Sequence, residues 1–535
     1  MLAICLLIIS VIYFYYKHKN RYRDSCLATI PGPRPRYPLI GNLDLFSIPG
    51  VPYNKSIYPT LISLCKQYNN YGIYKLLIGH KPVVVIFKSD LMTKIFSSNI
   101  NIDKSYIFNF LTDWLGDSLV MTTGSKWKGR RKLLTPAFHM KILDDYQPLI
   151  NEQTSIFVKK IIDISIDRQQ YIDIREPLTL LTLDIICETA MGVQIGAQLG
   201  KNKTYVQTIH DIGEIFMKRI FSPWIWSDVL FYRTTIGRKF RKTLETSHSF
   251  TRNVINEKKN MFITNNNNNK SDNKKQISND NNDNYFLTNN KKSMAFMDLL
   301  LDYHIKDNKL SVDDIREEVD TVMFAGHDTT SVSLGWTIYL IGLHPKVQEK
   351  IHEELTTIFG SDNDNNDNDI NRDITSADIQ RMTYLDCVLK ESLRMYPSAP
   401  LIARRLVEDC PVGDNNDNNN NYVIPAGVDV FLMVRQMHYN REVFADPNQF
   451  RPERFQSDSS MSQINAYNYV PFSAGPRNCI GKRFAIIVEM IVLAKILLNF
   501  SIESLEPLDS IETSVELMFR AKSPLNVRFI PKISN

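Results

Sequence analysis

One cysteine, Cys479, stands in the segment PFSAGPRNCIGKRFA (residues 471–485), among two glycines, two prolines and three cationic side chains. A long apolar run that begins at Ile480 follows and predicts a helix. The cysteine is therefore expected at a helix N-terminus, where the helix dipole and free N–H groups favour a thiolate. The chain must fold so that a stiff turn presents one sulfur at the start of a helix.

The residues around this sulfur indicate what it binds. Gly475 and Gly481 carry no Cβ, so a flat group can approach the loop, and Arg477 can pair with an anion. A zinc site needs companion Cys or His at short spacing, and a nucleophilic cysteine needs a His base; the segment offers neither. Most free cysteines are small buried hydrophobes. This frame instead favours an axial haem ligand, whose thiolate pushes electron density onto iron.

Composition excludes two classes of protein. The 535 residues carry a net charge of +5, and 58 acidic side chains are interspersed with the basic ones, so nucleic-acid binding is not expected. The seven cysteines are widely scattered and lack the pattern of a disulfide framework, so we expect a reducing compartment. Hydrophobic residues make up 43% and permit a sizeable core.

The N-terminus predicts a membrane anchor. Residues 1–16 contain no charge, and the basic sequence KHKNRYR follows at once. A cleaved signal peptide is the alternative, but it needs a basic start and a small-residue cleavage site, and neither is evident. The cations after the span favour a cytosolic main domain. We expect a transmembrane anchor over 1–16, a basic and proline-rich linker over 17–42, and the main domain over 43–535.

Three tracts rich in Asn and Asp interrupt the main domain, near residues 264–292, 361–372 and 413–421. They offer too little apolar surface to offset the entropy of ordering, so they are expected to be disordered surface insertions. Because patterned sequence continues on both sides, they mark loops rather than domain borders.

The patterned parts are mostly helical. Ser311 in SVDD predicts an N-cap with an acid three residues on, and a proline-free run then continues to about Leu343. A second helix is expected over 384–395. Strand patterns are short, at 81–87 and 428–434. The fold class is therefore mainly α with small β-sheets.

The middle of the long helix contains AGHDTT (residues 325–330), a run of helix-weakening residues. Thr hydroxyls can bond back to the preceding turn and bend a helix, so a packing kink is one interpretation. The other is a groove with a carboxylate and a hydroxyl at its edge, a pair that can deliver protons.

The segment FSAGPRNCIG (residues 472–481) resembles the haem-binding signature of the cytochrome P450s, F-x-x-G-x-R-x-C-x-G, at every fixed position. The resemblance extends from about residue 31 to 530, apart from the Asn-rich insertions. It implies the cytochrome P450 fold and haem b, with Cys479 as the metal ligand. The signature residues that it places at the cofactor are Phe472, Gly475, Arg477, Cys479 and Gly481.

Two further motifs resemble those of the same family. AGHDTT resembles its oxygen-activation motif, which implies Asp328 and Thr329 as a catalytic acid–alcohol pair. ESLRMYP and FRPERF resemble its E-x-x-R and P-E-R-F elements, which implies that Glu391, Arg394 and Arg454 form one buried structural network. Isolated surface pairs of this kind contribute little, but a buried set would lock the cysteine loop.

The stretch KWKGRRKLLTPAFH (residues 126–139) places Trp127 and Arg131 four residues apart on a predicted helix. The resemblance makes them donors to a haem propionate, and Arg404 and Arg477 are further candidates. A basic face on this side would steer an acidic electron donor, which the resemblance implies is NADPH–cytochrome P450 reductase. Its expected members are Lys126, Lys128, Arg130, Lys132, Lys482 and Arg483.

Within the P450s the chain is similar to the fatty-acid ω-hydroxylase family, on residues 110–139 and 316–330. Many of those enzymes esterify the haem through a glutamate where this chain has Ala325, so haem here is expected to be non-covalently bound. The family pattern also suggests an apolar substrate pocket. It would be bordered by Phe110, Val120, Ala325, Leu401 and Ile402.

The resemblance implies a haem-thiolate monooxygenase that takes electrons from a reductase and inserts one oxygen atom of O2 into a hydrophobic substrate. A fatty acid, sterol or other lipid is expected, with the protein a single-pass protein of the endoplasmic reticulum membrane that faces the cytosol. Two alternatives stay open: a haem-thiolate isomerase or dehydratase of lipid peroxides, and a non-catalytic haem-binding sensor.

Overall fold

The structure is a computed structural model that describes residues 18, 20–35, 37, 40–47, 53–164, 170–276, 294–360, 372–413, 421–456 and 466–532. The expected anchor over 1–16 lies outside these residues. Within the described ranges, no helix combines the length and apolar character needed to cross a membrane.

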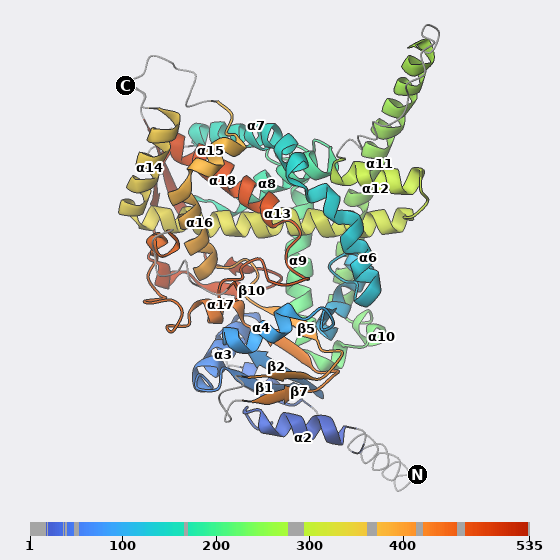
Figure 1. The fold of residues 1–535 in the computed structure, drawn as a ribbon, viewed down its shortest axis with the longest axis vertical. Coiled ribbons are helices and arrows are strands. Elements are labelled where there is room, and N and C mark those ends of the chain that lie inside the picture. The colour runs from blue at the N-terminus through green and yellow to red at the C-terminus, as the bar shows by residue number, and fades with distance from the viewer. Residues whose placement is uncertain are drawn as a thin grey trace, which may run out of the picture.

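Helices make up most of the described chain, as the sequence predicts (Figure 1). The α-helices are α2 (Arg21–Thr29), α3 (Tyr53–Gln67), α4 (Ser89–Ser97), α5 (Thr112–Leu115), α6 (Gly124–Leu134), α7 (Met140–Ile164), α8 (Arg175–Ile186), α9 (Lys203–Ile220), α10 (Asp228–Phe231), α11 (Thr235–Gln276), α12 (Phe296–Ile305), α13 (Val312–Leu343), α14 (Pro345–Phe359), α15 (Ser376–Arg381), α16 (Thr383–Met395), α17 (Val434–His438) and α18 (Lys482–Asn499). Short 3-10 turns include η2 (Tyr106–Leu111) and η6 (Pro452–Phe455), and a π-turn, η4 (Cys187–Met191), extends α8.

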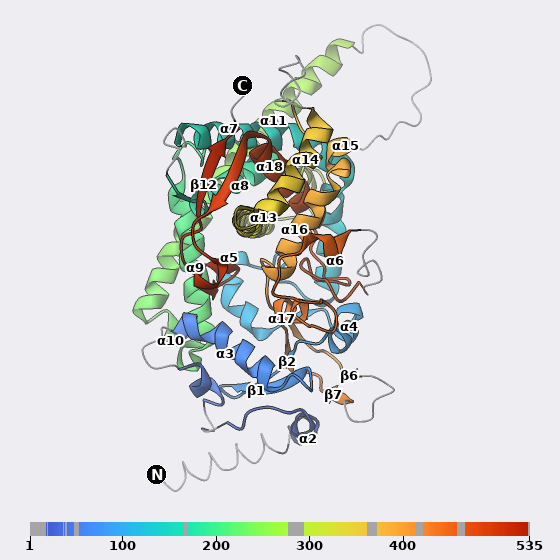
Figure 2. The same cartoon turned by 90° about the vertical axis from the view of Figure 1, so that its left-hand side faces the viewer.

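The predicted long helix is observed as α13, and its start is fixed by Ser311. Ser311 Oγ accepts a hydrogen bond from Asp314 N (3.0 Å), and Asp314 Oδ2 accepts one from Ser311 N (2.9 Å). This reciprocal capping box satisfies N–H groups that the helix itself cannot pair. α13 crosses the molecule in Figure 1 and is seen end-on near its centre in Figure 2, so the other elements are arranged around it.

Within the ranges that the structure describes, the strands form four small sheets. The largest has the order β1 (Ile73–Ile78), β2 (Lys81–Ile86), β8 (Asp429–Leu432), β5 (Ile402–Arg405) and β3 (Asp103–Lys104). The others pair β4 (Ile172–Asp173) and β9 (Phe500–Ser504) with β12 (Asn526–Pro531), β6 (Cys410–Val412) with β7 (Tyr422–Ile424), and β10 (Thr513–Val515) with β11 (Phe519–Ala521).

Both strands predicted from the sequence lie side by side in the largest sheet. β2 and β8 pair in parallel, with Val83 opposite Asp429 and Ile86 opposite Leu432. Their apolar residues are buried, which matches the continuous hydrophobic runs expected of strands covered on both faces. The sheet therefore joins segments from opposite ends of the chain.

The part of the expected linker that the structure describes packs on this sheet. α2 buries Leu27, and Ile30 is buried just after it. Lys75 of β1 donates to the Leu27 carbonyl through its side chain and to the Pro31 carbonyl through its backbone N–H (2.8 Å). A Cβ on Gly32 would lie 2.3 Å from the Lys75 carbonyl oxygen, so the linker approaches β1 as closely as glycine permits.

The expected insertions fall largely outside the described residues. α11 continues to Gln276, so the first part of the 264–292 tract is helical here, while residues 277–293 are not described. Residues 361–371 and 414–420, which make up almost all of the other two tracts, lie outside the described ranges.

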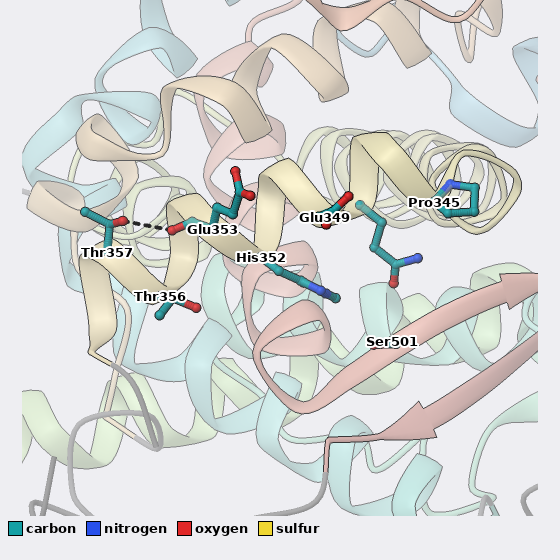
Figure 3. Close-up of a pocket in the computed structure, with 8 residues that line it drawn as sticks. Pro345, Glu349, His352, Glu353, Thr356, Thr357 and Ser501 are labelled. Carbon is teal, nitrogen blue, oxygen red and sulfur yellow. Dashed lines mark hydrogen bonds between the residues drawn. The ribbon is translucent and has the colours of Figure 1, made fainter. Parts of the chain in front are cut away.

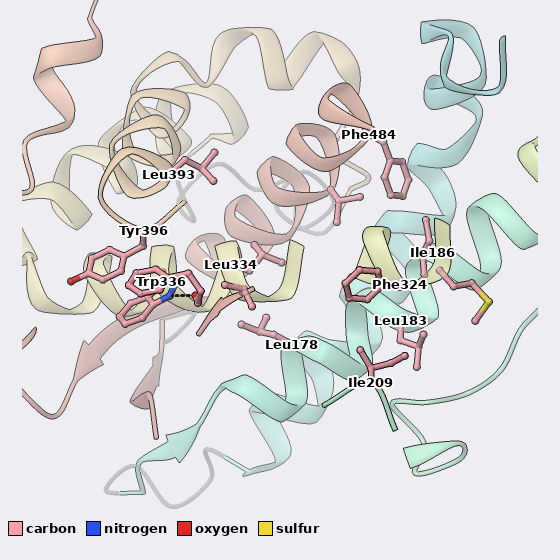
Figure 4. Close-up of a cluster of buried hydrophobic side chains, with 14 of the residues drawn as sticks. Leu178, Leu183, Ile186, Ile209, Phe324, Leu334, Trp336, Leu393, Tyr396 and Phe484 are labelled. Carbon is pink, nitrogen blue, oxygen red and sulfur yellow. Dashed lines mark hydrogen bonds between the residues drawn. The ribbon is translucent and has the colours of Figure 1, made fainter. Parts of the chain in front are cut away.

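The main hydrophobic core surrounds α13, which packs against α8, α16 and α18 (Figure 4). Trp336 of α13 stacks on Tyr396 with ring centroids 4.0 Å apart, and its indole N–H donates to the Phe519 carbonyl (3.2 Å). Each such buried side chain contributes about 1.5–3 kcal/mol. α13 thus packs against α16, which carries Glu391 and Arg394, and against α18, the helix that follows the cysteine loop.

Candidate haem site

The cysteine loop is a tight turn closed by its own backbone. Cys479 N–H donates to the Phe472 carbonyl (2.9 Å), and Asn478 N–H donates to the Gly475 carbonyl (3.1 Å). Ser473 and Gly475 adopt positive φ angles of 62° and 69°. α18 begins at Lys482, a little later than the sequence pattern predicts, so Cys479 precedes the helix by a short turn.

The Cys479 thiol is accessible, but protein atoms surround it densely. This burial raises its pKa, while the backbone N–H of Gly481, Arg131 and Lys482 act in the opposite direction. The thiolate form of this sulfur is stabilised most by a bond to a cation, because a metal ion binds the thiolate directly.

Gly475 is required by the loop itself. A Cβ at this position would lie 1.8 Å from the Phe96 carbonyl oxygen, so the close neighbour of Gly475 is protein backbone. At Gly481 an added Cβ would meet only the Phe138 ring, at 3.9 Å, which is ordinary contact. Space for a flat group at this loop is therefore found beside Gly481 and not beside Gly475.

The variant Gly475→Ala is expected to destabilise the protein by at least about 1–3 kcal/mol, because alanine is strained at positive φ and its Cβ clashes with Phe96. Urea unfolding measures the change. Gly129→Ala, in α6 with open space around it, is the matched control and should be neutral or stabilising by about 0.5–1 kcal/mol. Equal midpoints for the two variants would show that Gly475 is not constrained.

The structure brings Glu391, Arg394 and Arg454 together in full burial. Arg394 Nε and Nη2 donate to the two Glu391 carboxylate oxygens (2.7 and 2.9 Å), and Arg454 Nε donates to Glu391 Oε1 (2.9 Å). The backbone N–H of Arg451 donates to the same carboxylate (2.9 Å). The remaining guanidinium donors reach backbone carbonyls, including those of Pro447 and Ala445, so every charge in the network is paired.

Arg131 of α6 connects its helix directly to the cysteine loop. Its Nη1 and Nη2 donate to the backbone carbonyl and the side-chain oxygen of Asn478, both at 2.8 Å. Trp127, one turn earlier, is buried, and its indole N–H has no hydrogen-bond partner among the described residues. α6 therefore presents one free indole donor and one arginine beside Cys479.

Arg477 crosses from the loop to the segments before α6. Its Nε and Nη1 donate to the carbonyls of Ile102 (2.9 Å) and Leu119 (3.0 Å), and Nη2 donates to the Thr122 carbonyl. Its guanidinium lies 4.6 Å from the centroid of the Trp127 ring. Burial, followed by the charge of Arg404, lowers the pKa of Arg477 to about 9.

Three cations gather beside the loop, and none of them forms an ion pair with a carboxylate among the described residues, although the charge of Asp103 acts on Arg477. Lys104 of β3 lies opposite Arg404 of β5, and Arg477 is close to both. Burial and the charges of Arg404 and Arg477 lower the pKa of Lys104 well below its usual value, and burial lowers that of Arg404 to about 10. Such a cluster is stable only beside an anion, which the carboxylates of a haem would supply.

Asp328 and Thr329 lie in the middle of α13, which stays helical throughout. Asp328 is buried and its carboxylate accepts a hydrogen bond from Arg520 of β11, while Thr329 Oγ1 donates to the Ala325 carbonyl (2.7 Å). Burial raises the pKa of Asp328, but the Arg520 guanidinium outweighs it, so the pKa lies below its usual value. A Cβ on Gly326 would lie 2.6 Å from Ile186, so this glycine permits the close packing of α8 on α13.

The five expected pocket residues are distributed over several elements. Phe110 belongs to η2 and to the main core, and Leu401 packs against the same core. Ile402 begins β5 and packs against a second, smaller core. Val120 and Ala325 are half-buried.

The expected basic face is wrong for Arg130. This side chain is buried and forms ion pairs with Asp314 and Glu318, the latter at 3.5 Å. Lys126 is paired with Asp117. Lys126 is nevertheless exposed, and the other exposed members are Lys128, Lys132, Lys482 and Arg483.

A surface groove of about 630 Å³ runs along α14, away from the predicted site residues (Figure 3). It is lined by Glu349, His352, Glu353 and their neighbours, and Thr357 Oγ1 donates there to the Glu353 carbonyl (2.9 Å). Across the described part of the chain, no group of three acidic, His or Cys side chains is arranged to hold a metal ion. The groove therefore does not compete with the cysteine loop as a metal site.

Sequence reasoning missed three residues of the site: Lys104, Arg520 and His438. Arg520 contacts Asp328 across 192 positions of sequence, and no local pattern predicts such a contact. Lys104 is recognised as a residue of the site only through the pairing of β3 with β5, which places it opposite Arg404. His438 is buried between Arg394 and the segment before the cysteine loop.

Comparison with known proteins assigns the family. The family model for cytochrome P450 matches residues 31–528. The chain is 38% identical to Cytochrome P450 4V2 of Rattus norvegicus over 94% of this chain and 90% of the relative. It is 36% identical to Cytochrome P450 4c3 of Drosophila melanogaster, over 97% of this chain and 92% of the relative.

The residues present fit the cofactor of that family, haem b on a cysteine thiolate. The loop presents an accessible sulfur, and buried Arg404 and half-buried Lys104 and Arg477 form no ion pair with a carboxylate among the described residues. With a matching family model over nearly the whole length and two relatives above 35% identity, the chain belongs to the cytochrome P450 family of haem-thiolate monooxygenases.

Proposed function

We propose that this monooxygenase inserts one oxygen atom of O2 into a lipid, such as a fatty acid or sterol, with electrons from an NADPH-dependent reductase. Cys479 is the iron ligand in this proposal. The observation that carries it is the fastening of the Cys479 loop: Arg131 holds Asn478 at 2.8 Å, and the Glu391 network braces the preceding segment.

Haem b, when bound, supplies the activation of O2. Cys479 would hold the iron, and Lys104 and Arg404 would bind the propionates, with the indole N–H of Trp127 as a further donor. Arg477 already donates from Nε, Nη1 and Nη2 to three backbone carbonyls, so it would contribute mainly its positive charge. Arg131 already donates two hydrogen bonds to Asn478, from Nη1 and Nη2, so its main contribution is to hold the loop. Phe472, Gly475 and Gly481 shape the turn.

Asp328 and Thr329 would hold and pass on the protons that the reaction needs. Arg520 keeps the Asp328 carboxylate ionised inside the protein, ready to accept a proton from water and pass it on. The Thr329 hydroxyl, bonded to the Ala325 carbonyl, is held at the half-buried surface of α13 as donor and acceptor.

The exposed cations Lys128, Lys132, Lys482 and Arg483 support an acidic electron donor. Lys482 and Arg483 follow the loop that carries Cys479, and Lys128 and Lys132 belong to α6, whose Arg131 bonds to that loop. We assign the protein to the endoplasmic reticulum membrane through residues 1–16, with the main domain in the cytosol. The basic segment after residue 16 supports this orientation.

The test is reconstitution with NADPH–cytochrome P450 reductase and a panel of fatty acids and sterols. Oxygenated product should form only when NADPH, reductase and O2 are all present. Product from a lipid hydroperoxide without NADPH would instead identify an isomerase or dehydratase. Haem binding with no product from any lipid would point to a sensor.

A further inference from the structure

His438, the last residue of α17, is fully buried and bonded to two separate parts of the site. Its Nε2 accepts a hydrogen bond from the Val470 N–H (3.0 Å), and its Nδ1 lies 3.2 Å from the Arg394 carbonyl oxygen. Arg394 Nη1 in turn donates to the His438 carbonyl (3.0 Å). One imidazole ring thus joins the Glu391 network to the backbone that leads into the cysteine loop.

The contacts of the ring determine its protonation. The Val470 N–H can only donate, so Nε2 must carry a lone pair and Nδ1 must carry the proton that is donated to Arg394. Burial, helped by the charge of Arg394, lowers the pKa of His438 to about 3, so the neutral ring is the stable form. Nδ1 therefore acts only as a hydrogen-bond donor and Nε2 only as an acceptor.

Val470 directly precedes the cysteine loop in sequence. Its carbonyl accepts from Ser473 N–H (2.9 Å), and the Phe472 carbonyl accepts from Cys479 N–H (2.9 Å). Tyr469 stacks on the His438 ring, with centroids 5.4 Å apart, and donates to the Lys390 carbonyl of α16 (2.9 Å). A shift of Val470 would therefore be passed to the turn that presents the sulfur.

We propose that His438 is a positioning residue of the haem site. By holding Val470 against α16, it fixes the direction from which Cys479 presents its sulfur to the iron. This inference rests on the proposed function, in which Cys479 is the ligand. His438 itself touches none of the reacting atoms.

Two substitutions separate the two hydrogen bonds of the ring. In His438→Gln the side-chain amide reaches the place of Nε2 and can accept from Val470 N–H. In His438→Asn the shorter amide reaches only the place of Nδ1 and can donate to the Arg394 carbonyl, which leaves Val470 N–H buried without an acceptor. Both replacements are polar amides, so each serves as the control for the other.

The full-length holoprotein of each variant is examined in three ways: carbon monoxide difference spectra, haem reduction potential, and amide hydrogen exchange at Val470. We expect His438→Gln to resemble the wild type. His438→Asn should speed exchange at Val470 by about tenfold, the equivalent of one buried hydrogen bond. It should also convert part of the spectrum from the thiolate type to the thiol type and shift the potential, while amides of α13 exchange as before.

Equal behaviour of the two variants, whether both are normal or both defective, overturns the proposal. The wild-type spectrum provides the separate check on the ligand. If the wild type itself lacks the thiolate-type spectrum, the proposed function fails. If the wild type shows it and the variants do not differ, only the role of His438 fails.

Discussion

A Cys479→Ser protein is expected to lose the thiolate-type carbon monoxide spectrum and to lose turnover by on the order of 100-fold or more. Removing a residue that merely orients a metal ligand costs about 10–100-fold, so replacing the ligand itself should cost at least as much. A serine hydroxyl cannot supply the electron density with which a thiolate favours O–O cleavage. Difference spectroscopy and reductase-supported product formation measure the two losses.

The matched control is Cys26→Ser, which removes a thiol from a half-buried position in α2, far from the loop in sequence. It should keep the wild-type spectrum and turnover. Should the Cys479→Ser protein behave like this control, another residue must hold the iron, and the assignment of the site is wrong.

Glu391→Ala is expected to cost about 3–5 kcal/mol and to yield protein without bound haem. The Glu391 carboxylate accepts from Arg394, Arg454 and the Arg451 backbone, so its removal leaves two guanidinium groups buried without their anion. The free energy of unfolding is measured in urea, and haem content by absorbance per mole of protein.

Glu349→Ala is the control for the loss of a carboxylate, because Glu349 is exposed on α14, and its effect should stay within about 0.5 kcal/mol. Glu391→Gln keeps the shape of the side chain without its charge and should fall between the two. Normal haem content in Glu391→Ala would show that the loop holds its position without the network.

Local patterns predicted the helices of the site well. α13 could be predicted from the sequence because Ser311 and Asp314 cap its start and no proline interrupts it before Leu343. The i, i+3 spacing of Glu391 and Arg394 likewise follows from one turn of α16. Arg454 could be added only through the family resemblance, because it reaches Glu391 across 63 positions.

Partners brought together by tertiary folding could not be predicted in this way. The sequence pattern predicts Arg130 on an exposed basic face, but in the fold this side chain is buried and forms ion pairs with Asp314 and Glu318 of α13. The reason for glycine at Gly475 is the Phe96 carbonyl, which no local pattern reveals. Neither periodicity nor composition indicates which distant groups a side chain will meet.

The parallel pairing of β2 with β8 has a consequence for how the protein is made. A ribosome delivers β2 early and β8 only after most of the chain has emerged, so the five-stranded sheet cannot close during the greater part of synthesis. The cysteine loop is translated later still. Until β8 has been synthesised, the edge of β2 that pairs with it stays without its partner strand. Haem binding therefore takes place in the final stage of maturation.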